Sequence, residues 1–165
     1  MSATNRDARI AGLLYLLIVL AAPIRLVYIP GKLFVSGHAA ETVHNIAAQE
    51  WLFRLGIASD LFTGVVGLLL LLALYRLLKS VDKRWALLMV AFGIWDAPLY
   101  FFNAVNDSAA LLLAGSPGFM SAFGPAQRDA LAVFFLHLHG QNIVFAEIFW
   151  GLWLLPLAVL VYRSG

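Results

Sequence analysis

The sequence contains no cysteine and few charged residues. Without cysteine the chain has no disulfide framework, no thiolate metal site and no cysteine nucleophile. Charged residues make up only 12% of its 165 residues, against about 25% in an ordinary soluble domain. A soluble fold of this length would need more charge to cover its surface, so the composition excludes an ordinary soluble globular protein.

The sequence also lacks a strong charge of one sign and the common catalytic motifs. Its formal net charge is +2 at pH 7 and its basic residues form no continuous stripe, so we expect no nucleic acid partner. No glycine-rich phosphate loop, His-Glu-x-x-His motif or recognisable nucleophilic triad occurs. These absences point away from an enzyme more than toward one, and the sequence implies no particular cofactor.

Long apolar runs are what the sequence has in abundance. Hydrophobic residues make up 62% of the chain, and a helix needs about 20 such residues to cross the roughly 30 Å hydrocarbon core of a bilayer. Four stretches are long enough: residues 10–29, 51–75, 85–105 and 142–162. The sequence therefore predicts an all-α polytopic membrane protein, a single domain over residues 1–165 with four transmembrane helices in the lipid bilayer.

The basic residues outside these runs predict the orientation of the chain. Most of them lie at the two termini and in the second loop: Arg6, Arg9, Arg76, Lys79, Lys83, Arg84 and Arg163. Basic residues accumulate on the cytoplasmic side, so we expect both termini in the cytoplasm. Pro23 beside the one plausible cleavage site argues against a removed signal peptide. In the outer loops we expect short interfacial helices, at residues 39–49 and after Pro125.

Several ionisable residues fall inside the apolar runs. With 1.5 Å of rise per residue, Arg25, Asp60 and Glu147 lie at one depth, about 22 Å above the cytoplasmic edge. Each charge costs roughly 2.5–3.5 kcal/mol at the helix centre, so these side chains should face one another. We expect Arg25 to pair with Asp60 or Glu147. The acids outnumber the cations, which favours a site for a small ligand, a lipid headgroup or a proton, with these candidate residues: Arg25, Arg54, Asp60, Asp96, Asn103 and Glu147.

The same residues are open to a structural interpretation. Polar groups that cross between helices can hold a membrane bundle together, and small residues such as Gly64 and Gly67 allow close approach of two helices. In that case the chain would be a structural or assembly subunit, as a homo-oligomer or beside other membrane subunits.

The four histidines indicate a third class of function, a metal-dependent enzyme. His38, His44, His137 and His139 map to the outer loops or the outer end of the fourth helix, where they are candidate ligands for zinc or copper in a metal-dependent membrane enzyme. In a helix, residues i and i+2 point about 200° apart, so His137 and His139 should not bind one ion together.

Five short segments resemble a bacterial integral-membrane family, domain of unknown function four-three-eight-six. They are residues 7–15 (DARIAGLLY), 52–61 (LFRLGIASDL), 138–140 (LHG), 149–151 (FWG) and 162–164 (YRS). The resemblance implies a multi-helix inner-membrane protein of unassigned activity, and similar proteins continue with further helices, so this chain would be a short member or a fragment.

The resemblance also bears on individual positions. It makes Arg54, Asp60 and His139 typical residues and Asp96 an acidic position of the third helix. Glu147 and Gly93 depart from the pattern, where an apolar and a basic residue respectively are more usual.

Overall fold

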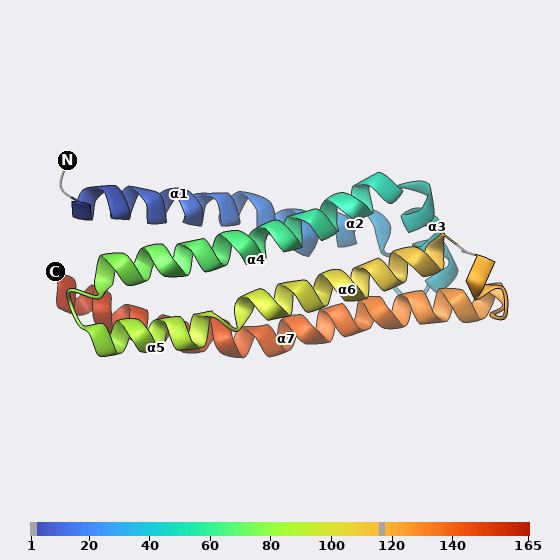
Figure 1. Ribbon diagram of the computed structural model, residues 1–165. Coiled ribbons are helices and arrows are strands. Elements are labelled where there is room, and N and C mark those ends of the chain that lie inside the picture. Colours follow the sequence, from blue (N-terminus) through green and yellow to red (C-terminus); the bar gives the residue numbers. More distant parts are fainter. Residues whose placement is uncertain (1–2, 116–117) are drawn as a thin grey trace.

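The structure is a computed structural model that describes residues 3–115 and 118–165. In these two ranges the regular elements are all helices and no strand is present, which confirms the all-α prediction. In chain order they are α1 (Ala3–Pro23), the π-helical turn η1 (Ile24–Tyr28), α2 (Ile29–Leu33), α3 (Ala39–Ala48), α4 (Glu50–Leu78), α5 (Lys83–Gly93), α6 (Asp96–Ala114), the 3-10 turn η2 (Gly118–Met120) and α7 (Pro125–Ser164) (Figure 1).

Four helical stretches are long and apolar enough to cross a membrane, as predicted. They are Asn5–Leu33, Glu50–Leu78, Lys83–Ala114 and Pro125–Ser164. Each contains one of the predicted spans but is longer. α3 confirms the short helix expected in the first outer loop. The short helix expected after Pro125 is not separate, because α7 continues from Pro125 through the fourth span without a break.

The spanning helices form two layers, one of α1 and α4 and the other of α5, α6 and α7. α1 packs along one side of α4, while α6 packs along its other side, and α5 and α6 both pack along α7 (Figure 1). The N- and C-termini lie at one end of the bundle and α3 lies at the opposite end. At the end with the termini, the Arg163 Nη1 donates to Asp82 Oδ2 at 2.6 Å, and the same Asp82 side chain caps α5 by accepting from the amides of Arg84 and Trp85. This contact fastens the end of α7 to the start of α5.

Two of the apolar core clusters occupy opposite ends of the bundle. The α3 end is packed around Phe53, Ile29, Leu33 and Ile46, all 0% exposed. The end with the termini is packed around Met89, Ala86 and Leu160, also 0% exposed. Between them lies a layer of buried polar side chains: Arg25, Ser59, Asp60, Thr63, Asn103, Asn106, Asp107, His139 and Asn142. These polar side chains therefore lie inside the bundle, where they avoid the cost of a polar group in lipid.

The chain enters this polar layer through a widened turn of the first spanning helix. Pro23 has no amide hydrogen and closes α1, and the π-helical turn η1 follows it directly. A π-helical turn rotates the side chains that follow it relative to a regular α-helix. Arg25 lies in this turn and is only 2% exposed.

The two glycines that suggested close helix packing differ in the structure. A methyl group on Gly64 would lie 3.0 Å from the Cβ of Tyr100, whereas one on Gly67 would meet nothing within 4 Å. We expect Gly64→Ala to lower the free energy of unfolding by about 1–3 kcal/mol, because α4 and α6 would have to separate. Gly67→Ala should instead raise it by about 0.4–1 kcal/mol, because alanine restricts the unfolded chain. Melting temperatures of both variants in one detergent test this, and a loss for both would contradict it.

Candidate functional site

One ionisable side chain from each of the four spanning helices meets in the middle layer of the bundle. Arg25 comes from η1, Asp60 from α4, Asp107 from α6 and His139 from α7. Each is at most 3% exposed. We call these four residues the charged cluster. Because its members come from four helices, the cluster forms only when the whole bundle is assembled.

Arg25 and Asp107 form the strongest pair of the cluster. The Arg25 Nε donates to Asp107 Oδ2 at 2.6 Å, and Nη2 donates to Asp107 Oδ1 at 2.8 Å. Two parallel bonds of this kind are the favoured geometry between a guanidinium group and a carboxylate. The rings of Phe34 and Phe53 also lie 5.6 and 6.0 Å from the guanidinium carbon, within the range of a cation–π contact. The charge of Arg25 is therefore fully compensated inside the bundle.

His139 stands between the two acids of the cluster. Its Nδ1 lies 3.0 Å from Asp107 Oδ1 and 3.2 Å from Arg25 Nη2. Its Nε2 lies 3.9 Å from Asp60 Oδ2, which is too long for a hydrogen bond. An ionised Asp107 can only accept, so the shorter contact needs a ring hydrogen on Nδ1, and in the neutral imidazole Nε2 then carries a lone pair. Within the described residues, neither Nε2 nor Asp60 Oδ2 has a hydrogen-bond partner.

A pair of asparagines joins α6 to α7 beside the cluster. The Asn142 side-chain amide donates to Asn103 Oδ1 at 2.8 Å and to the backbone oxygen of Leu99 at 2.9 Å. Asn103 is thus a buried interhelical contact, one turn from the charged cluster.

The predicted pairing of Arg25 with Asp60 or Glu147 is wrong. Arg25 pairs with Asp107, and Glu147 points away from the cluster on the exposed face of α7. The rise per residue gives the height of a side chain but not its direction around the helix axis, and α7 turns Asn142 and Ala146 inward instead. Arg54 also lies outside the cluster, because it pairs with Glu50 one turn away on the exposed side of α4, at 2.6 Å.

The histidines separate into one buried and three exposed residues. His139 belongs to the charged cluster, whereas His38, His44 and His137 are exposed. The expectation that His137 and His139 point in different directions is therefore met. Asp107 was not among the residues predicted for the site, although it lies on the same face of the helix as Asp96 and Asn103, eleven and four residues later. That stripe was the signal that could have identified it.

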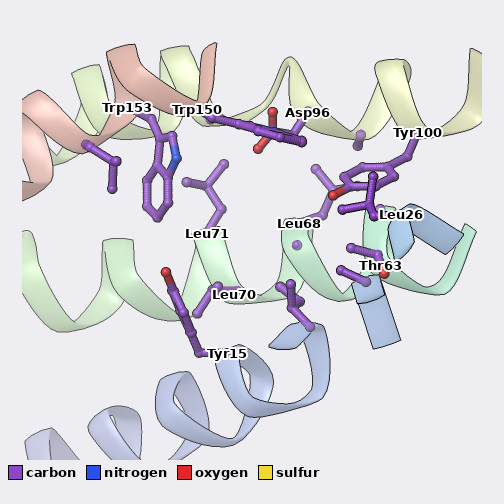
Figure 2. Close-up of a pocket in the computed structure, with 17 residues that line it drawn as sticks. Tyr15, Leu26, Thr63, Leu68, Leu70, Leu71, Asp96, Tyr100, Trp150 and Trp153 are labelled. Atoms are coloured by element: carbon purple, nitrogen blue, oxygen red, sulfur yellow. The ribbon is translucent and has the colours of Figure 1, made fainter. Parts of the chain in front are cut away.

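A cavity of about 340 Å³ lies between α1 and α4 on one side and α5, α6 and α7 on the other. Figure 2 shows Tyr15 from α1 and Trp153 from α7 reaching into it from opposite sides. Its lining is apolar and aromatic apart from a few groups, of which Asp96 is the one carboxylate among the lining residues that the structure describes. The Asp96 carboxyl has a hydrogen-bonding neighbour in Trp150, but its buried Oδ1 has no partner within the described residues.

A second, smaller void lies between the cavity and the charged cluster. It measures about 10 Å³, close to the smallest space that holds one water. Asp60 and His139 line it on one side and Asp96, Tyr100 and Trp150 on the other, and the last three also line the larger cavity. Asp96 therefore stands between the cavity and the charged cluster.

Comparison with known proteins yields one match. A family described as a domain of unknown function (DUF4386) matches residues 10–165, nearly the whole chain, in agreement with the resemblance of the five short segments. No curated protein and no solved structure matches the chain.

Proposed function

We propose that this chain, which belongs to the DUF4386 family of domains of unknown function, binds a small amphipathic organic cation in the cavity beside Asp96. It is a membrane protein with four spanning helices. The expected ligand is a protonated amine or quaternary ammonium ion with an apolar body.

The observation that carries this proposal is the Asp96 carboxylate. It lies in a spanning helix at the wall of an apolar cavity, with a buried oxygen that no described group satisfies. An unpaired charge at such a depth costs roughly 2.5–3.5 kcal/mol, which a bound cation would offset. None of the cavity-lining residues that the structure describes is basic, so an ionised Asp96 is neutralised either by a proton or by a cation from outside this lining.

The rest of the cavity suits an organic cation better than a metal ion or a lipid headgroup. The rings of Tyr100, Trp150 and Trp153 line it together with Asp96 (Figure 2), and aromatic faces beside a carboxylate are typical of ammonium recognition. A volume of about 340 Å³ lies at the lower end of small-molecule sites. The leucines and glycines of α4 supply an apolar floor for the body of the ligand.

The proposal is tested by titrating the protein in lipid nanodiscs with benzyltrimethylammonium and with its neutral carbon analogue, neopentylbenzene. Binding is followed by calorimetry and by the intrinsic tryptophan fluorescence, to which Trp150 and Trp153 contribute. We expect Asp96→Asn to weaken binding of the cation about 10- to 100-fold, since a charge-assisted contact contributes roughly 1.5–3 kcal/mol. The neutral analogue should bind the wild type and this variant equally.

Glu147→Gln is the matched control, because Glu147 is an exposed carboxylate of the spanning part of α7 that does not line the cavity. It should leave binding unchanged. If the cation bound no better than the neutral analogue, or if Asp96→Asn bound it as well as the wild type does, the proposal would be wrong.

An assembly role is the second candidate function, and Glu147 is the observation that favours it. Its carboxylate faces away from this chain beside exposed apolar residues such as Val144 and Ile148. A charge on this face is costly in lipid and is relieved by contact with another subunit. The hydrogen bonds of Asn142 and Arg25 join helices of this chain, whether it binds a ligand or assembles with another subunit.

We also infer a single domain in a bacterial inner membrane, with both termini in the cytoplasm. The two termini lie at one end of the bundle (Figure 1). The α4–α5 loop lies at the same end, and the basic residues there include Arg76, Lys79 and Lys83. An excess of such residues is typical of the cytoplasmic side.

A further inference from the structure

We propose that Asp60 and His139 bind a divalent first-row transition metal ion inside the bundle, and that Asp107 orients the imidazole of His139 for it. The site differs from the cation site beside Asp96 and does not depend on it. It also differs from a site built of the outer histidines, since His38, His44 and His137 are exposed and lie outside the charged cluster.

The three side chains of the proposed site lie close together and come from different helices. One ligand atom each of Asp60, Asp107 and His139 lies within 4.8 Å of the other two. The three residues belong to α4, α6 and α7 and are at most 3% exposed. A site of this kind is held by the packing of three spanning helices, so its geometry is set before an ion arrives.

Two unsatisfied atoms point to an ion at this place. Asp60 Oδ2 and His139 Nε2 are both buried, and within the described residues neither has a hydrogen-bond partner. They face each other across 3.9 Å. A hydrogen bond would need about 2.7–3.2 Å, whereas an ion about 2.0–2.2 Å from each atom fits between donors separated by that distance. The gap is too wide for a direct bond and suits a bridging ion.

The charges of the cluster leave room for the ion. Arg25 neutralises Asp107 through two hydrogen bonds, so Asp60 is the carboxylate without a cationic hydrogen-bond partner among the described residues. A neutral His139 with its hydrogen on Nδ1 presents the Nε2 lone pair that a metal needs. The contact of Nδ1 with Asp107 Oδ1 at 3.0 Å then reproduces the carboxylate–histidine–metal arrangement that fixes the ring and its tautomer.

The void beside these atoms provides room for a further ligand. It is lined by Asp60, His139 and Asn103 and adjoins the larger cavity through Asp96 and Tyr100. With a volume of about 10 Å³ it holds about one water, which would be a third ligand beside Asp60 and His139. Imidazole and carboxylate together suit ions such as Zn²⁺, and we use Zn²⁺ as the probe.

The test uses the full chain with its exposed histidines replaced, His38→Gln, His44→Gln and His137→Gln, so that surface binding does not contribute. The purified protein in nanodiscs is stripped with a chelator and titrated with Zn²⁺ alone. Elemental analysis after gel filtration gives the stoichiometry. We expect one ion per chain. The visible absorption of Co²⁺ in place of Zn²⁺ then reports the coordination geometry.

Two further variants decide which residues hold the ion. Asp60→Asn keeps the shape of the side chain and should weaken Zn²⁺ binding by more than 100-fold, more than the roughly 10- to 100-fold loss typical of a residue that only orients a ligand. His139→Ala should also abolish the Co²⁺ spectrum, with circular dichroism as the check on folding. Absence of saturable Zn²⁺ binding to the wild-type cluster, or unchanged affinity in a folded Asp60→Asn variant, would overturn the proposal.

Discussion

Replacing Asp107 with alanine is expected to lower the free energy of unfolding by about 3–5 kcal/mol, because the charge of Arg25 would remain in the bundle without a carboxylate. Asp107 is 0% exposed and receives two hydrogen bonds from Arg25. The variant would also leave His139 Nδ1 without its acceptor. Unfolding of the purified protein by increasing mole fractions of SDS in mixed micelles measures the loss.

The control is the exposed ion pair of α4. Arg54 and Glu50 lie as close as Arg25 and Asp107, at 2.6 Å, but their side chains are 63% and 53% exposed. Glu50→Ala should therefore cost no more than about 1 kcal/mol. The double variant Arg25→Met/Asp107→Leu should recover most of the loss, because it removes both charges together. Equal losses for Asp107→Ala and Glu50→Ala would show that the Arg25–Asp107 pair does not stabilise the bundle.

Truncating Phe53 to alanine is expected to have an effect of similar size, about 3–5 kcal/mol, because a fully buried ring leaves a cavity in a packed core. Phe53 is 0% exposed and belongs to the apolar cluster at the α3 end. Its ring lies 6.3 Å from that of Phe34 and 6.0 Å from the Arg25 guanidinium carbon, so the truncation also removes one aromatic wall around the charged cluster.

Phe62 on the same helix supplies the comparison. It is 45% exposed and faces outward from α4, so Phe62→Ala removes a side chain whose place lipid or detergent can fill. We expect it to cost much less than Phe53→Ala in the same SDS titration. If Phe53→Ala and Phe62→Ala unfolded at the same mole fraction of SDS, the prediction of a tightly packed core at the α3 end would be wrong.

The helices themselves were predictable because their signal is local. Each spanning helix contains a long run of apolar residues, and the length of such a run has to match the thickness of the bilayer whatever its neighbours are. The ends were less predictable, because polar residues before Asn142 belong to the same helix as the apolar run after it. The sequence indicated a helix start at Pro125 but did not reveal that this helix continues into the fourth span.

The sequence indicated which kinds of side chain lie in the polar layer but not which of them contact one another. An ionisable residue in an apolar run is conspicuous in the sequence, as Arg25 and Asp60 are. His139 was assigned to the outer end of the fourth helix, and Asp107 was not among the candidate residues. Both turn out to be buried members of the charged cluster. Their positions follow from where the spanning helices begin and end, which the apolar runs leave open by several residues.

Hydropathy and charge are properties of each residue, so the amino-acid sequence was enough to identify a four-helix membrane protein with costly charges inside it. The pairing of Arg25 with Asp107 and the outward direction of Glu147 emerged only from the folded bundle. Pairing depends on the rotation of each helix about its axis. That rotation is set by the widened turn at η1, by the close approach of α4 and α6 at Gly64, and by the packing of all four helices together.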